Sequence, residues 1–166
     1  KNTRAAIWDA LQARETFGTS GTRMKIRMFG GESLGVPADE VAMVKTGYAK
    51  GVAMGGNLKG LAKAPTFNVW ASKDPDGANL DRVQVIKGWV DSGGKTHEQV
   101  YDVKWSGAET GRKPGANGKL PPVGNTVDLK TATFTNTIGA VELKGTWTDP
   151  SFDATQNAVY YARVIQ

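Results

Sequence analysis

Residues 64–105 read APTFNVWASKDPDGANLDRVQVIKGWVDSGGKTHEQVYDVKW, and this stretch decides the fold. It holds three apolar runs of strand length, separated by two segments rich in Asp and Gly. Short apolar runs bounded by turn residues are typical of consecutive β-strands. The stretch therefore predicts a β-meander on which the other elements pack.

Two turn signals divide this stretch. Asp74–Gly77 reads Asp-Pro-Asp-Gly, in which Pro presets φ and Gly accepts a positive φ. Asp91–Lys95 reads Asp-Ser-Gly-Gly-Lys and predicts a hairpin to the third strand. In that strand Tyr101, Val103 and Trp105 share one parity, which predicts that Trp105 faces the core.

The first of the three strands has two distinct faces. Phe67, Val69 and Ala71 alternate with Asn68 and Trp70, so the apolar set predicts a core on one side. Asn68 and Trp70 are then expected on the other, exposed face. An exposed indole can stack on a sugar ring, although internal or interdomain packing is the simpler interpretation of the tryptophans.

On the N-terminal side, residues 4–15 predict the only strong helix of the chain. Its residues Ile7, Trp8 and Leu11 form an apolar stripe. This stripe must pack on the sheet or on a neighbour outside this sequence. Residues 23–29 alternate apolar and basic side chains, which predicts a half-buried strand.

Two segments read as long loops. Residues 32–64 have poor periodicity and many glycines, so we expect an irregular connection that covers a surface, with one helical turn at 39–44. Residues 106–125 are rich in Gly, Pro, Lys and Asn and predict a long surface loop.

The C-terminal part adds strands at 126–134, 143–148 and 158–165. The last is apolar on both sides and predicts a central, fully covered strand. Six or seven short strands predict a mainly β fold: an immunoglobulin-like antiparallel β-sandwich with one N-terminal amphipathic helix and long loops. We divide the chain into a helix and loop at residues 1–22 and a sandwich domain at residues 23–166.

Composition limits the possible functions. The 166 residues suit one domain, and the absence of cysteine excludes disulfides and thiolate metal sites. The net charge is +5, but the basic residues are scattered rather than clustered with aromatic residues, which argues against nucleic-acid binding. No apolar run approaches the roughly 20 residues that a membrane helix needs.

Catalytic chemistry has few candidates. His97 is the only histidine, whereas a catalytic zinc site commonly takes about three protein ligands. A nucleophilic triad would need that same His97 beside Ser92 and Asp91, and adjacent turn residues rarely converge in this way. Asp74–Asp81 concentrates oxygen ligands, which leaves calcium as an alternative to a simple turn. We expect no catalytic residue, no metal site and no cofactor.

Several stretches together resemble known families. Residues 5–23, AAIWDALQARETFGTSGTR, resemble the segment that closes the barrel of PHP-type (polymerase and histidinol phosphatase) metallohydrolases. Five further stretches resemble the bacterial domain-of-unknown-function 3604 family: Gly51–Gly56, Asp74–Trp89, Pro122–Leu129, Trp147–Pro150 and Tyr160–Val164. The chain departs from that family at Ala53, where relatives more often have Pro, and relatives continue beyond Gln166.

The resemblance implies a C-terminal portion of a longer, metal-dependent hydrolase whose preceding region holds the metal ligands. We therefore expect a non-catalytic accessory domain whose partner is that preceding catalytic domain, with a carbohydrate- or ligand-binding sandwich as the alternative. By the same resemblance the loop at residues 19–23 lies close to the barrel. This makes Arg23 a candidate ligand-binding residue, in addition to Trp70 and Asn68, which are candidates because of their strand face. We favour a periplasmic or extracellular location for the parent protein.

Overall fold

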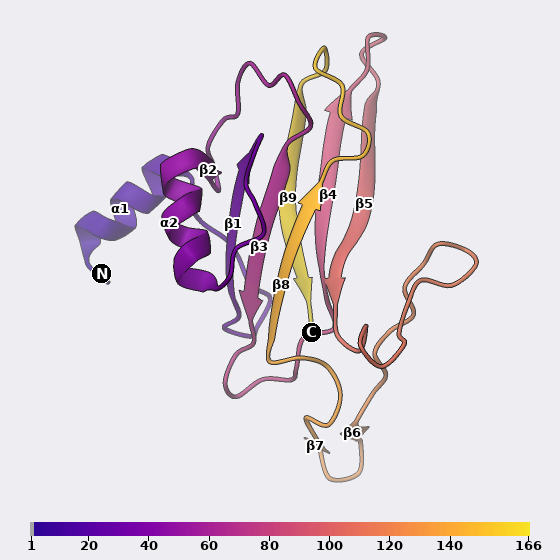
Figure 1. Ribbon diagram of the computed structural model, residues 1–166. Coiled ribbons are helices and arrows are strands. Elements are labelled where there is room, and N and C mark those ends of the chain that lie inside the picture. Colours follow the sequence, from indigo (N-terminus) through magenta and orange to yellow (C-terminus); the bar gives the residue numbers. More distant parts are fainter. Residues whose placement is uncertain (1) are drawn as a thin grey trace.

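A computed structural model describes residues 2–166 and shows two antiparallel sheets that face each other (Figure 1). The first sheet has the strand order β2-β1-β3-β8 and the second the order β5-β4-β9. The strands are β1 (Lys25–Gly31), β2 (Val52–Ala53), β3 (Thr66–Ser72), β4 (Arg82–Val90), β5 (Thr96–Trp105), β8 (Glu142–Thr148) and β9 (Ala158–Ile165). The predicted mainly β sandwich is confirmed, while its immunoglobulin-like character and the boundary at residue 22 stay predictions.

The chain has two helices within the described residues, where the sequence predicted one. α1 (Arg4–Ala13) begins after Thr3, whose side-chain oxygen accepts the N–H of Ala6. α2 (Glu40–Lys50) replaces the single helical turn expected at 39–44, and Asp39 caps it by accepting the N–H of Ala42 at 2.7 Å. The segment does cover a surface, because α2 packs on the outer side of the first sheet.

Gly47 explains why this helix was missed. A glycine within residues 32–64 reads as a loop signal. In the structure Gly47 is buried inside α2, and a Cβ atom there would lie 2.3 Å from the ring of Phe29. The glycine therefore permits close contact between α2 and β1 rather than ending a helix.

The predicted β-meander is wrong, because β3 and β4 belong to different sheets. β3 pairs with β1 on one edge and with β8 on the other, so neither edge is free for β4. The segment with the Asp-Pro-Asp-Gly turn thus carries the chain from one sheet to the other. The hairpin between β4 and β5 is confirmed, and β9 pairs along the other edge of β4.

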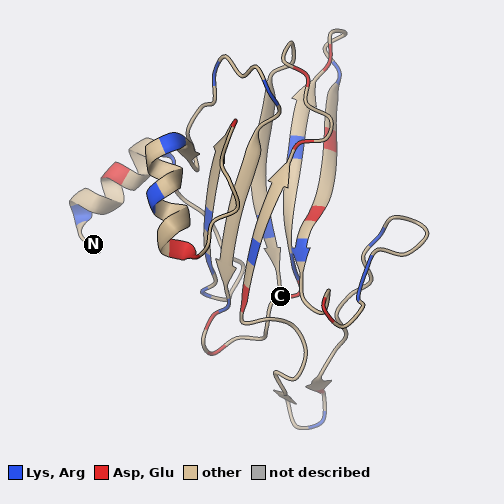
Figure 2. Cartoon of the chain, viewed as in Figure 1, with Lys and Arg blue, Asp and Glu red and all other residues tan. Residues whose placement is uncertain are grey.

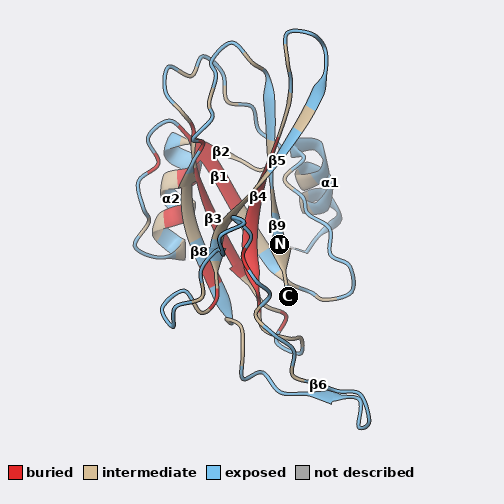
Figure 3. Cartoon of the chain, turned by 90° about the vertical axis from the view of Figure 1, so that its right-hand side faces the viewer, coloured by how far each residue is buried: buried red, intermediate tan, exposed pale blue. Residues whose placement is uncertain are grey.

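The main core lies between the sheets, and a second apolar cluster lies beneath α2 (Figure 3). The predicted inward face of β3 is confirmed. The main core consists of Met28, Phe67, Val69, Ala71, Leu80, Val83, Val85 and Leu143, and the second cluster of Phe29, Leu34, Met43 and Trp70. The first sheet is therefore covered on both faces.

A β-bulge reverses the predicted orientation of Trp105. Val83 pairs with Lys104, but Gln84 pairs with Asp102, so β5 contains one extra residue at this point. Because successive side chains alternate between faces, an extra residue moves everything beyond it to the opposite face. Trp105 pairs with Arg82 and lies on the outer face of the second sheet, not in the core.

Two other expectations change near the C-terminal end. Residues 126–134 form a small hairpin of β6 (Val127–Asp128) and β7 (Thr133–Phe134) instead of one strand. The final strand β9 is an edge strand, not a central one. The long loop predicted at 106–125 is confirmed, because it contains no strand or helix.

Charge and hydropathy add two findings. Lys and Arg are distributed over the helices, strands and loops, with Asp and Glu among them (Figure 2). No helix in residues 2–166 combines the length and apolar character needed to cross a bilayer. The expectation that the chain does not bind nucleic acid stays a prediction.

Candidate functional site

Trp70 and Asn68 lie beneath α2 rather than on an exposed face. Trp70 is only 8% exposed and belongs to the apolar cluster under that helix. The side-chain amide of Asn68 donates to the carbonyl of Gly35 at 3.1 Å and accepts from the hydroxyl of Thr146 at 2.7 Å. The predicted exposure of both residues is therefore wrong. Ligand binding by Trp70 and Asn68 stays a prediction, but the exposed indole on which it was based is absent.

Arg23 lies at the corner where β1 begins. Its backbone N–H donates to the carboxylate of Asp74 at 2.7 Å, and its guanidinium, on a side chain that is 79% exposed, lies 3.5 Å from a carboxylate oxygen of Asp76. Asp74 also accepts the N–H of Asp76, so it serves as a turn acceptor. No group of three or more His, Asp or Glu within residues 2–166 is arranged to hold a metal ion. Contact of Arg23 with an anionic substrate stays a prediction.

His97 lies at the tip of the β4–β5 hairpin with two partners. Its ring stacks on Trp89 with the centroids 5.2 Å apart, and its Nε2 lies 2.6 Å from a carboxylate oxygen of Asp91. The pKa of Asp91 is held below its usual value by His97 and then by the backbone N–H of Lys95. These contacts of His97 therefore hold the hairpin closed.

A buried ion pair lies between the sheets at one end of the sandwich. The ammonium of Lys87 donates to Asp149 at 2.6 Å, and both side chains are almost fully buried. The same ammonium donates to the carbonyl of Ser151 at 2.7 Å and lies within 3.2 Å of its hydroxyl. The hydroxyl of Tyr160 donates to Asp149 at 2.7 Å. Lys87 was not predicted, although its parity with Val83 and Val85 in β4 indicates an inward side chain.

The pKa values of Asp149 and Tyr160 are both shifted away from neutral pH. Burial opposes ionisation of Asp149, but hydrogen bonds from Lys87, Tyr160 and Ser151 outweigh it and lower the pKa of this carboxyl. Burial and the neighbouring Asp149 raise the pKa of Tyr160 well above its usual value. General acid–base catalysis favours a group whose pKa lies near the working pH, so the cluster is suited to holding the turn at residues 149–151.

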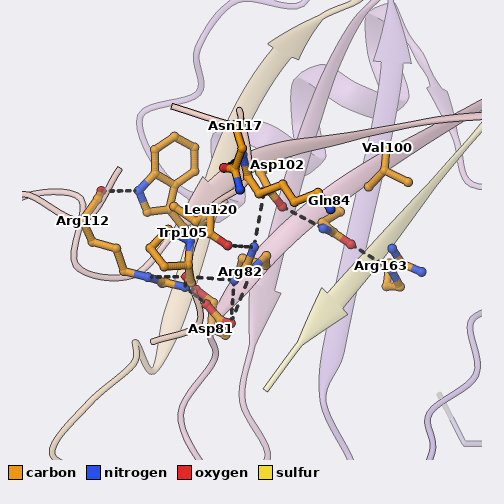
Figure 4. A network of polar contacts seen from close by, with 12 residues as sticks. Asp81, Arg82, Gln84, Val100, Asp102, Trp105, Arg112, Asn117, Leu120 and Arg163 are labelled. Carbon is orange, nitrogen blue, oxygen red and sulfur yellow. Dashed lines mark hydrogen bonds and ion pairs between the residues drawn. The ribbon is translucent and has the colours of Figure 1, made fainter. Parts of the chain in front are cut away.

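A second polar network lies on the outer face of the second sheet (Figure 4). The guanidinium of Arg82 contacts the carboxylates of Asp81 and Asp102 and the carbonyls of Leu120 and Pro121. The N–H groups of a guanidinium point in fixed directions, and these four partners accept hydrogen bonds from the guanidinium of Arg82. The network thus joins strand β4 to the far end of the loop at residues 106–121.

Arg112 closes the same loop from its other side. Its guanidinium donates to the carbonyl of Ser106 at 2.9 Å and to that of Pro121 at 2.6 Å, and it pairs with the carboxylate of Asp81. Its own carbonyl accepts the indole N–H of Trp105 at 2.8 Å. Both arginines are engaged within the chain, which fits a structural clamp better than an anion-binding site.

A groove of about 1530 Å³ runs along the open side of the sandwich, between β1 and β9. Met24, just before β1, and Ile26 of β1 line one wall, and the other wall contains Tyr160, Ala162 and Val164 of β9. All five residues border the main core but are only partly buried. The sequence did not predict this groove, although the apolar composition of residues 158–165 indicates a strand that is covered on both faces.

Comparison with known proteins gives one match. No curated protein and no solved structure matches the chain significantly. The family described as "Protein of unknown function (DUF3604)" matches residues 1–166, which is the whole length of the chain. The relatedness expected from the five stretches is therefore confirmed for this family, while the PHP-type resemblance stays a prediction. The chain belongs to the DUF3604 family.

Proposed function

We propose that this chain is a non-catalytic accessory domain that packs on a PHP-like, metal-dependent hydrolase domain of the same polypeptide and shapes access to its active site. The observation that carries the proposal is the apolar stripe of α1. Ile7, Trp8 and Leu11 are 52%, 61% and 56% exposed, respectively. Three large neighbouring apolar side chains on one helix face favour contact with another protein surface.

The position of α1 supports this proposal. Ala6 and Ala10 of the helix are half-buried, whereas the large apolar side chains of its stripe are exposed. The C-terminal end of α1 is anchored, because the carbonyls of Ala13 and Arg14 lie close to Gly55. The stripe is thus held in a defined position on the molecule, and it lies in the segment that resembles the closing element of a PHP-type barrel.

The alternative of a carbohydrate-binding sandwich has less support. Its motivating residue, Trp70, is covered by α2. The two buried polar networks also leave few free donors for a ligand, because Lys87, Arg82 and Arg112 bond to groups of the chain itself.

The test uses the full-length polypeptide with Leu11→Glu, and Gln12→Glu as the matched control with the same added charge. After proteolytic cleavage between the domains, the two fragments of the parent protein and of the control should co-elute on size-exclusion chromatography. Leu11→Glu should weaken their association at least about tenfold, which corresponds to about 1.4 kcal/mol.

Two results would overturn the proposal. One is equal co-elution of the Leu11→Glu and Gln12→Glu fragments, which would place the interface elsewhere. The other is metal-dependent phosphoesterase activity of residues 1–166 alone at the level of the full-length protein. Leu11 is exposed in the isolated domain, so Leu11→Glu should leave the melting temperature of residues 1–166 nearly unchanged. This result would show that the substitution acts on the interface and not on the fold of the domain.

A further inference from the structure

Strand β9 has the composition of a covered strand but lies at the edge of a sheet. Apart from Arg163, its residues are apolar toward both faces, yet within residues 2–166 no strand pairs with its outer edge. Its register with β4 is unbroken from Trp89↔Ala158 to Arg82↔Ile165. Sheet edges are usually protected by Pro, by bulges or by inward charges. β9 has none of these, so its backbone N–H and C=O groups remain available for pairing.

The inner face of β9 is also incomplete. Tyr160, Ala162 and Val164 point toward the core but are only half-buried, whereas the inward side chains of the central strands β3 and β4 are buried. Met24 and Ile26, at the start of β1, line the groove from the opposite side and are likewise half-buried. One additional strand beside β9 would cover all five side chains and pair the free edge.

We propose that the groove between β1 and β9 binds an extended β-strand of a partner polypeptide. The strand would pair antiparallel with β9 and direct every second side chain, which must be apolar, into the groove. Backbone pairing would supply affinity, and the alternating side chains would supply specificity, as in other cases of strand addition. This proposal concerns a different surface from the α1 stripe and does not depend on it.

The charges at the groove define the partner further. The exposed charged residues that line it are Arg14, Lys59 and Arg163, against one acid, Asp153. Arg163 projects from the outer face of β9, so an acidic residue opposite it in the added strand would form a favourable cross-strand pair. A second copy of this chain, with its formal charge of +5, would bring like charges together. The partner strand is therefore an acidic, alternately apolar segment of another protein.

The first experiment supplies such a strand within the chain. A turn of Asn-Gly is added after Gln166, followed by Thr-Thr-Val-Glu-Val-Thr-Val-Thr, which in a two-residue hairpin directs Val toward the groove and Glu opposite Arg163. The matched control, Thr-Val-Thr-Val-Glu-Val-Thr-Thr, has the same composition but directs Val outward. The in-phase tail should raise the melting temperature by about 4 °C or more, and the control by less than about 1 °C.

A second measurement addresses the source of the strand. The in-phase peptide without the fusion should slow hydrogen exchange of β9 amides in the unmodified chain, and the control peptide should not. Equal effects of the two tails, or no effect of either, would refute the proposed groove specificity. The unmodified chain could also dimerise, and the in-phase tail could abolish that dimer. This result would identify a second copy of the chain as the occupant of the groove and would refute the proposal of an acidic partner.

Discussion

The buried pair of Lys87 and Asp149 is the residue-level feature that most affects stability. Each charge is almost fully removed from water and depends on the other for compensation. The attraction within such a pair roughly offsets the cost of burial, but removing one partner leaves an uncompensated buried charge. The pair therefore contributes little net energy as long as it is intact and a large penalty when it is broken.

We predict that Lys87→Met lowers the free energy of unfolding by about 3–5 kcal/mol. The control is Lys144→Met, which removes an exposed lysine paired with Glu142 on the surface and should cost less than about 1 kcal/mol. Urea unfolding followed by circular dichroism measures both. Equal effects of the two substitutions would show that Lys87 is not an essential partner of Asp149.

The carboxylate of Asp74 predicts a dependence of stability on pH. The backbone N–H groups of Arg23 and Asp76 hold its pKa below the ordinary value of 3.8. A lowered folded-state pKa stabilises the protein above the pKa of the unfolded chain, and this contribution is lost as the pH falls through the folded-state pKa.

Asp74→Asn should therefore destabilise the protein at pH 7, and the difference from the parent protein should shrink near pH 3. Urea midpoints at both pH values test this, with Asp9→Asn on the exposed surface of α1 as the control. The control should show a small difference that stays constant. If Asp74→Asn lowered the free energy of unfolding by the same amount at both pH values, the ionised carboxylate of Asp74 would not be the stabilising group.

At the level of elements, the loop at residues 106–121 is ordered by side chains rather than by secondary structure. Arg82 and Arg112 occupy its carbonyl groups at Ser106, Leu120 and Pro121. Long loops without regular structure usually owe their order to such contacts. The composition of this segment predicted a loop but could not show that it is fixed to β4.

Replacing Arg112 should release this loop. Arg112→Ala removes the contacts to Ser106, Pro121 and Asp81, so amides of residues 107–120 should exchange hydrogen faster, while those of β4 should change less. The exposed neighbour Lys113 gives the control, Lys113→Ala, which should leave the exchange unchanged. Hydrogen exchange followed by mass spectrometry measures the difference, and unaltered exchange in Arg112→Ala would show that Arg82 alone suffices.

At the scale of the whole molecule, the two sides of the sandwich differ. β5 and β8 lie against each other on one side, whereas the other side opens into the groove between β1 and β9. The exposed α1 stripe adds a second incompletely covered apolar surface. Both surfaces retain apolar area that a partner can bury, and the two proposals arise from them.

The sequence by itself determined most strands, the inward face of β3, and the stripe of α1. These features follow from local alternation and from turn residues, which act over a few positions. The sequence patterns gave wrong predictions for features that depend on residues far apart in the chain. Gly47 was interpreted as a loop residue because its contact with Phe29 is not visible in any local sequence pattern. Trp105 was predicted to face the core because no local sequence pattern indicates the bulge in β5.

Only the tertiary structure decided strand order, and with it the candidate sites. From the sequence, the strand at residues 66–72 could pair with β4 or with another strand. In the structure β1 pairs with one edge of this strand and β8 with the other, which excludes β4. That choice placed Trp70 under α2 and left β9 at an edge. Backbone pairing is almost independent of side-chain identity, so a sequence specifies that a strand forms more readily than it specifies which strand lies beside it.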